Sequence, residues 1–219
     1  IGLSHLITTE EAGSGIAVHI SSHDHNAAIF THRGANCCLT SPQVNNVAFT
    51  DYDLIYVTNL SNESVEQFPL IIDKAHEAGC FIASNPGIRQ LTNKSQDFLS
   101  SLKSISLLSI NTVECAALIP HLISANRPAD IAASPLGEDL PPLLKKGFKI
   151  AGFSLDLTSC LKILSAHGPE YVVITDGSKG AYLFHKDVLY YCPPQETKMQ
   201  GSAGAGDCFS STLASLICS

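Results

Sequence analysis

Short apolar runs alternate with amphipathic stretches from about residue 34 onward, and this alternation constrains the fold more than any other feature of the chain. Leu54–Val57 is an apolar run, and the residues after it carry apolar side chains at helical spacing: Val65, Phe68, Ile72 and Ala75. Gly79 ends that helical stretch, and Cys80–Ala83 is the next apolar run. Strands separated by helices of this length predict parallel βαβ crossovers and a covered sheet.

The same cycle recurs in the second half of the chain. A helical stretch around 155–167 stops at Gly168, and Tyr171–Ile174 follows as a buried strand. Ala181–Phe184 and Val188–Cys192 then flank a short polar turn, which predicts a hairpin. The region from residue 34 to residue 219 is therefore expected to form one α/β core.

The first 33 residues follow a different pattern. Residues 15–20 and 26–31 are two short β-rich runs joined by a polar segment, Ser21–His25. Such runs around a turn-forming cluster predict a hairpin, and a small antiparallel sheet is the simplest interpretation. We therefore divide the chain into residues 1–33 and residues 34–219.

Composition excludes several classes of protein. Apolar residues make up 45% of the 219-residue chain and charged residues only 15%, which argues against intrinsic disorder. With 13 Lys and Arg against 20 Asp and Glu, the net charge is −7, so a nucleic-acid partner is not expected. No apolar run approaches the roughly 18 residues of a membrane-spanning helix, so no membrane partner is expected either.

The 8 cysteines predict free thiols. No two of them form a C-x-x-C pair, and most lie inside apolar runs, as in Ala-Gly-Cys80-Phe-Ile. Free thiols behave in this way when they serve as small buried apolar side chains. The pattern is typical of a reduced, cytoplasmic protein.

A glycine-rich loop near the end of the chain carries the strongest functional signal. Gly201–Asp207 runs into a stretch of small and apolar residues, 208–216, that predicts a helix. Small residues let the backbone approach a ligand closely, and a helix start offers free N–H groups to an anion. The alternative is a plain loop in which Asp207 caps the helix, and spacing alone supports both interpretations equally.

Gly204-Ala-Gly-Asp207 before a helix of small residues resembles the second signature of the ribokinase-like (PfkB) family of carbohydrate and nucleoside kinases. The resemblance implies a three-layer α/β/α core, Rossmann-like, with a small β-sheet lid that includes residues 1–33. It implies that Asp207 is the general base that deprotonates the acceptor hydroxyl. It also implies that the amides of Gly204, Ala205 and Gly206 form an anion hole for the transferred phosphoryl group.

Asn111-Thr-Val-Glu114 matches the N-x-x-E element of the family. The resemblance implies that Asn111 contacts the nucleotide and that Glu114 organises Mg²⁺ through water. Two polar residues three positions apart at a helix start also form an ordinary capping box. For an isolated N-x-x-E, the capping box is the preferred interpretation.

Val173–Ala181 resembles the nucleotide-binding strand and turn of the family, V-T-x-G-x-x-G-A. Thr175, Gly177 and Gly180 occupy the matching positions, which implies contacts with ATP. An ordinary strand–turn–strand with glycines at positive φ is the alternative.

Two further segments resemble family elements beside the substrate. Gly34-Ala-Asn36 is similar to the G-A-N motif where the lid returns to the core, and Ser84-Asn-Pro-Gly-Ile-Arg89 is similar to the D-x-N-x-R or N-P-G segment. By this resemblance Gly34, Asn36, Asn85 and Arg89 are substrate-binding residues.

The chain departs from the family pattern in three places. Gly201-Ser-Ala203 stands where many members have D-T-T, and Ser84 stands where many sugar kinases have aspartate. The G-G-x-x-x-N motif of the first strand and the segments that complete the adenine pocket are not in this sequence. We therefore expect a chain truncated at both ends, and we expect it to be inactive alone.

The leading hypothesis is an ATP-dependent, Mg²⁺-assisted sugar kinase. A nucleoside kinase of the same fold is the nearest alternative, and a non-catalytic binding or regulatory module of this fold is the alternative from another class. Lid strands build a dimer interface in many members, so the resemblance also implies a homodimer through the lid.

Overall fold

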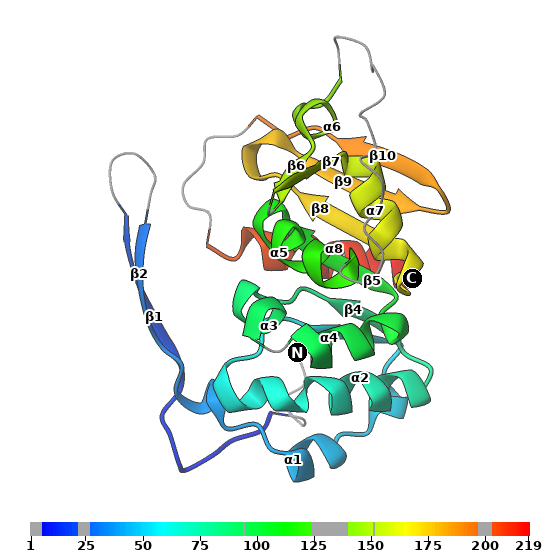
Figure 1. Cartoon of the computed structure of the whole chain (residues 1–219). Helices are drawn as coiled ribbons and strands as arrows, with labels where there is room; N and C mark the ends of the chain where they lie inside the picture. Colours follow the sequence, from blue (N-terminus) through cyan, green and yellow to red (C-terminus); the bar gives the residue numbers. More distant parts are fainter. Residues whose placement is uncertain (1–5, 22–26, 94, 124–139, 151, 197–202) are drawn as a thin grey trace.

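A mixed sheet forms the centre of the protein, as a computed structural model of the chain shows (Figure 1). The structure describes all residues except 1–5, 22–26, 94, 124–139, 151 and 197–202. The sheet has six strands in the order β10-β9-β8-β5-β4-β3. Their bounds are β3 (Leu54–Val57), β4 (Phe81–Ser84), β5 (Leu107–Asn111), β8 (Tyr171–Thr175), β9 (Ala181–His185) and β10 (Val188–Cys192). Within this sheet β3, β4, β5 and β8 are parallel, and β9 and β10 are antiparallel additions at one edge.

Helices and short hairpins connect these strands. The α-helices are α1 (Ser41–Asn45), α2 (Phe68–Glu77), α3 (Ile88–Asn93), α4 (Ser95–Ser101), α5 (Thr112–Ile123), α6 (Pro142–Lys146), α7 (Leu157–Ala166) and α8 (Ala205–Cys218). The 3₁₀ segments are η1 (Gly34–Cys37), η2 (Phe49–Asp51), η3 (Asn62–Gln67), η4 (Leu102–Ser104) and η5 (Gly177–Lys179). Two further two-stranded sheets are β1 (Ile16–Ser21) with β2 (Ala27–His32), and β6 (Phe148–Ile150) with β7 (Phe153–Leu155).

The two faces of the central sheet are covered unequally. The larger apolar core lies between the sheet and the layer that contains α2, α4, α5 and α7. The opposite face carries a small cluster, Ala83, Leu107 and Val173, against which Ala214 of α8 packs. The architecture is the predicted three-layer α/β/α arrangement, and α8 is its second helical layer in the described part of the chain.

The predicted alternation of strands and helices is confirmed, with one local difference. Val65, Phe68, Ile72 and Ala75 are all buried, as their spacing predicts. However, residues 62–67 form the 3₁₀ segment η3, and α2 begins only at Phe68 with a proline in its first turn. Proline lacks a backbone N–H and is accommodated best at a helix start, so it sets where α2 begins.

The predicted hairpin near the N-terminus is also confirmed, and it projects from the body as a two-stranded ribbon, which we call the lid ribbon (β1 and β2, Figure 1). Val18 pairs with Phe30, and Ile16 and Ile20 lie on the same face by strand alternation. Each of these side chains is more than half exposed. The lid ribbon therefore presents one apolar face that no described residue covers.

Two predictions about composition can be compared with the structure. All 8 cysteines are free thiols, as the sequence predicts, and Cys80, Cys115 and Cys160 are buried. Among the described helices, none combines the length and the apolar character needed to cross a bilayer.

Two leucine-to-alanine changes test how much the larger core contributes. Leu108 on β5 is fully buried at 0% exposure, whereas Leu216 on α8 is 70% exposed. We expect Leu108→Ala to lower the free energy of unfolding by about 2–5 kcal/mol, since it leaves a cavity. Leu216→Ala serves as the matched control and is expected to change it by less than about 0.5 kcal/mol. Urea denaturation followed by circular dichroism measures both, and equal losses would contradict this assignment of the core.

Candidate active site

The carboxyl ends of the parallel strands form one edge of the sheet, which we call the carboxyl edge. Val57 pairs with Ser84 at the ends of β3 and β4, and Asn111 pairs with Thr175 at the ends of β5 and β8. Ligands of open α/β sheets bind outside this edge. The strand register therefore brings most of the predicted site residues to a common edge, although they are far apart in the sequence.

Helix α8 begins at the glycine-rich loop, next to the carboxyl edge. Gly204 is its N-cap residue and has φ 75° and ψ 0°, a left-handed conformation that favours glycine. The first backbone bond of the helix runs from the Cys208 N–H to the Gly204 carbonyl at 2.9 Å. The N–H groups before Cys208 therefore lack intrahelical acceptors. A Cβ added at Gly206 would meet nothing within 4 Å, so the space beside this helix start is open.

Asp207 is the third residue of α8 and does not cap it. The structure assigns the N-cap to Gly204, with no side-chain capping bond, so the alternative of a capping aspartate is wrong. The Asp207 Oδ1 atom instead accepts a hydrogen bond from the Thr58 hydroxyl at 2.9 Å. Thr58 directly follows β3, so this bond holds the carboxylate against the carboxyl edge of the sheet.

Polar groups beneath Asp207 fasten α8 to the sheet. The hydroxyls of Ser109 on β5 and Ser210 on α8 are hydrogen-bonded at 2.7 Å, and both residues are buried. The hydroxyl of Tyr56 on β3 is also buried; among the described residues it makes no hydrogen bond of good geometry, but it lies close enough to Asp207, Ser210 and Thr58 for each to affect its pKa. Burial, and then the negative charge of Asp207, raise the pKa of Tyr56 to about 12. Tyr56 therefore stays neutral beside the carboxylate at physiological pH.

Tyr56 and Thr58 were not identified from the sequence. Both lie near the end of β3, two positions apart, and side chains at this spacing share a face of a strand. The sequence feature that could have identified Tyr56 and Thr58 as site residues is a polar pair at the carboxyl end of an apolar strand. Only the docking of α8 shows that this face meets Asp207.

Asn111 and Glu114 form the capping box that was the alternative interpretation of N-x-x-E. The Asn111 Oδ1 atom accepts from the N–H groups of Val113 and Glu114, each at 2.9 Å. The Glu114 Oε2 atom accepts in return from the Asn111 N–H at 2.8 Å. Burial raises the pKa of Glu114, the two Asn111 contacts oppose that rise, and the Asp207 carboxylate adds to it. Glu114 thus lies within electrostatic range of Asp207.

The predicted nucleotide-binding turn adopts the expected geometry. Thr175 ends β8, and Gly177 and Gly180 have φ of 55° and 98°. A Cβ at Gly180 would collide with the Cys192 carbonyl, so this turn requires glycine. The strand–turn–strand alternative describes the same geometry, and contact with ATP stays a prediction.

A cavity of about 280 Å³ lies beside this turn. Its lining includes Thr112, which follows Asn111, and Asp176, which follows Thr175. It also includes lysines from α6, β6 and η5: Lys146, Lys149 and Lys179. The lysines make this part of the carboxyl edge positively charged.

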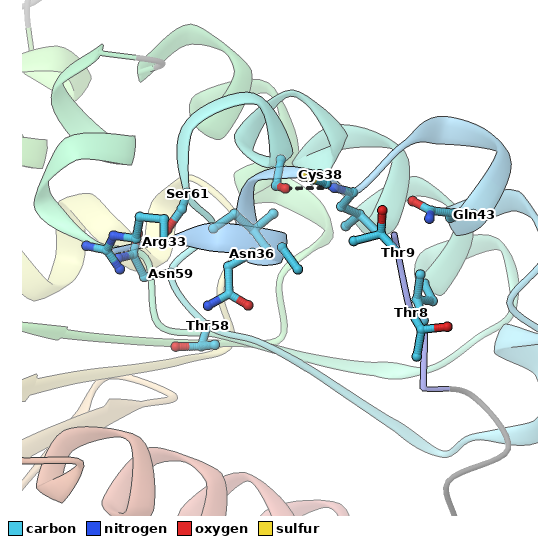
Figure 2. A pocket seen from close by; sticks show the side chains of 14 residues that line it. Thr8, Thr9, Arg33, Asn36, Cys38, Gln43, Thr58, Asn59 and Ser61 are labelled. Atoms are coloured by element: carbon cyan, nitrogen blue, oxygen red, sulfur yellow. Dashed lines mark hydrogen bonds between the residues drawn. The ribbon is translucent and has the colours of Figure 1, made fainter. Parts of the chain in front are cut away.

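Three of the four predicted substrate residues line cavities on the other side of Asp207, at the base of the lid ribbon: Gly34, Asn36 and Arg89. Figure 2 shows a cavity of about 370 Å³ whose lining includes Arg33, Asn36 and Thr58. Gly34, with φ 51°, begins η1 and lines a neighbouring cavity together with Arg89.

Asn85 differs from the other predicted substrate residues. Its Nδ2 group donates to the Ser109 carbonyl at 2.7 Å. Asn85 therefore ties the end of β4 to β5 through its side chain. The structure gives it this bond within the protein, and a contact with substrate stays a prediction.

Comparison with known proteins identifies the family. The model of the pfkB family carbohydrate kinases matches residues 1–218. The chain belongs to the pfkB family. None of the curated proteins compared with this pfkB-family chain matches it.

Solved structures show the same fold at low sequence identity. Adenosine kinase from Anopheles gambiae is 17% identical, with a TM-score of 0.70 over 95% of this chain and 58% of that chain. Ribokinase from Thermotoga maritima is 15% identical, with a TM-score of 0.63 over 94% of this chain and 57% of that one. Fructokinase from Xylella fastidiosa is 13% identical, with a TM-score of 0.67 over 96% and 58%. The pfkB-family chain thus spans less than two thirds of the length of these structures.

Two substitutions of Glu114 separate its capping bond from its charge. Glutamine can still accept from the Asn111 N–H, whereas alanine cannot. Because burial raises the Glu114 pKa, its ionised form disfavours folding above that pKa. We therefore expect Glu114→Gln to be at least as stable as the wild type at pH 7, and Glu114→Ala to lose about 1 kcal/mol. Thermal and urea unfolding measure the difference, and equal losses in both variants would contradict the capping role.

Proposed function

We propose that the protein transfers the γ-phosphoryl group of ATP to a hydroxyl group of a carbohydrate. The observation that carries this proposal is the placement of Asp207. Its carboxylate is bonded to Thr58, and Thr58 lines the cavity of about 370 Å³ at the base of the lid ribbon. A substrate in that cavity presents its hydroxyl to the Asp207 carboxylate, which can take up the proton.

The reaction needs little beyond positioning and charge stabilisation. Asp207 takes the proton of the acceptor hydroxyl as its oxygen attacks the γ-phosphorus atom, and ADP leaves. The amides of Gly204, Ala205 and Gly206 stabilise the charge of the transferred group. The positive end of the α8 dipole adds to this effect, since the helix has 14 residues and starts beside open space.

The other half of the carboxyl edge supports ATP as the donor. A cavity lined by Lys146 and Lys179 lies there. Next to it are the predicted nucleotide-binding residues Asn111, Thr175, Gly177 and Gly180. Lysine ammonium groups bind phosphate groups as point charges. The fructokinase of Xylella fastidiosa was solved with bound ATP, which agrees with this donor.

Glu114 is the residue proposed to hold a magnesium ion. Mg²⁺ is usually held by one or two carboxylates together with substrate phosphates and water. Glu114 and Asp207 supply two carboxylates within electrostatic range, and one oxygen of Glu114 is already used by the Asn111 N–H. When bound, Mg²⁺ neutralises charge on the phosphates. Glu114 would hold it through water, as the sequence predicts.

A nucleoside acceptor is the second candidate. Asn85-Pro-Gly87 has the N-P-G form, and it resembles a segment that is also seen among nucleoside-type members of the family. A Cβ at Gly87 would lie 2.5 Å from the side chain of Asn59, which lines the cavity of Figure 2. This segment therefore shapes the acceptor side through a close contact that glycine permits.

The lid ribbon supports the expectation of a homodimer. Isolated two-stranded ribbons are marginally stable, and this one exposes an apolar face made of Ile16, Val18, Ile20 and Phe30. Ile29 and Thr31 lie on the other face and line a cavity with Arg33. One face would thus cover the substrate and the other would pack on a second copy.

The free thiols support a cytoplasmic location.

Substitution of Asp207 tests the assigned reaction. We expect Asp207→Asn to lower kcat roughly 100-fold or more, since general-base catalysis contributes at least that much, while ATP affinity changes little. ADP release, measured over a panel of pentoses, hexoses and nucleosides, provides the readout. Equal rates for wild type and variant would refute the role of Asp207, and turnover with nucleosides alone would favour the second candidate.

Substitutions on the lid ribbon test the dimer. We expect Val18→Glu to convert a dimer to a monomer because it places a charge on the exposed apolar face. Thr31→Glu, on the opposite face, is the control and is expected to leave the dimer intact. Sedimentation velocity distinguishes the two states. A wild-type protein that is monomeric at micromolar concentration would contradict the proposal.

A further inference from the structure

A phenol lies on the face of the sheet that α8 covers. Leu54 and Tyr56, two positions apart on β3, pack against the small cluster that contains Ala214 of α8. The Tyr56 hydroxyl is shielded from solvent, and within the described part of the chain it makes no hydrogen bond of good geometry. A buried hydroxyl without a partner costs free energy and is rare in folded proteins, so an acceptor close to it is expected.

Three polar groups surround this hydroxyl. Asp207, Ser210 and Thr58 each lie close enough to affect its pKa, which burial and then the charge of Asp207 raise to about 12. The Tyr56 hydroxyl therefore keeps its proton at physiological pH and can donate one hydrogen bond. Only one of the three groups can be its main acceptor.

Asp207 is the strongest acceptor of the three. Hydrogen bonds to an ionised carboxylate are roughly twice as strong as those between neutral groups. The Ser210 hydroxyl is already bonded to the hydroxyl of Ser109 at 2.7 Å. The Thr58 hydroxyl donates to Oδ1 of Asp207 at 2.9 Å, which uses one of about four lone-pair positions of the carboxylate. The carboxylate can therefore accept from Tyr56 as well.

A second donor would fix the orientation of the carboxylate. With the Thr58 bond alone, the carboxylate keeps freedom to rotate about its own axis, whereas two donors from one strand and its continuation remove that freedom. A general base has to be oriented toward the proton that it takes. Hydrogen bonds in active sites are often long or poorly aligned without substrate, and they tighten when substrate binds.

We infer that Tyr56 is a positioning residue, whose hydroxyl donates a hydrogen bond to the Asp207 carboxylate and, together with Thr58, orients it toward the acceptor. This inference rests on the proposed function, because it assigns how the base of that reaction is held. Tyr56 is not among the described residues that line the cavity of about 370 Å³, whereas Thr58 is. Tyr56 therefore acts on the acceptor only through Asp207, and it affects the rate of transfer rather than acceptor binding.

The stability of two variants in combination tests the hydrogen bond without a measurement of activity. If Tyr56 donates to Asp207, Tyr56→Phe destabilises the wild type but not the Asp207→Ala variant, in which the hydroxyl has lost its acceptor. We expect the two changes to be coupled by about tenfold in the equilibrium constant for unfolding, measured by urea denaturation. The comparison cancels the loss of the Thr58 bond, which Asp207→Ala causes in both backgrounds.

Other arrangements of the hydroxyl predict different results. A hydroxyl without any partner predicts that Tyr56→Phe is neutral or stabilising in both backgrounds. A bond from Tyr56 to Ser210 predicts an equal loss of stability in both. Either result would contradict the bond to Asp207.

The rate of phosphoryl transfer tests the positioning role. ADP release is measured with the pentose, hexose or nucleoside that gives the wild type its highest rate, well below the unfolding temperature. We expect Tyr56→Phe to lower kcat about tenfold and to leave KM for that acceptor unchanged, because only the base is misplaced. Tyr171→Phe is the matched control, since Tyr171 packs against the same small cluster but begins β8, at the opposite edge of the sheet. It is expected to change neither kcat nor KM.

The possible results separate this inference from the proposed function. Equal effects of Tyr56→Phe on unfolding in the two backgrounds, or an unchanged kcat, would overturn the inference. ADP release that still depends on Asp207 would then leave the proposed function standing. Conversely, coupled unfolding without phosphoryl transfer to any of these acceptors would support the hydrogen bond from Tyr56 and refute the kinase.

Discussion

The register of the parallel strands is the constraint on which the site depends. β3, β4, β5 and β8 end next to one another because each pairs in parallel with its neighbour. Thr58, Asn85, Asn111 and Thr175 follow or end these strands and are thereby placed along a single edge. A shift of one residue in a strand would turn its side chains to the other face of the sheet. Buried apolar residues such as Leu108 and Val172 oppose that shift, because they would be moved out of the larger core.

Helix α8 carries Asp207, the proposed base, at this edge, and small polar contacts determine the position of the helix. The buried hydrogen bond between Ser109 and Ser210 fixes the helix against the sheet, and the bond from Thr58 orients Asp207. Asn111 and Glu114 show how one pair of residues can complete a helix start and still lie near the proposed base. Their capping box completes the start of α5, and the partly buried Glu114 carboxylate still lies in the field of Asp207.

The distribution of charge divides the carboxyl edge into two parts. Lys146, Lys149 and Lys179 surround the cavity on the proposed donor side, whereas Arg33 and Arg89 lie on the acceptor side. Both groups are positive in a chain whose net charge is −7. Asp207 lies between them, at the start of α8, where the helix dipole also favours negative charge.

The sequence by itself determined the alternation of strands and helices over residues 54–83 and 155–192, the hairpin near the N-terminus and the glycine-rich loop, because apolar periodicity and glycine placement are local properties. It also located Asp207, Asn111 and Glu114 through short motifs. It could not exclude a capping role for Asp207, because the helix start at Gly204 and the hydrogen bond from Thr58, a residue 149 positions away in the chain, are features of the folded protein. The sequence also could not show that the Tyr56 hydroxyl is buried or that Arg33 and Arg89 line the same cavity, because these too are contacts between distant segments. Contacts between distant segments arise only when the sheet register and the docking of α8 bring those segments together, and so only the tertiary structure decided them.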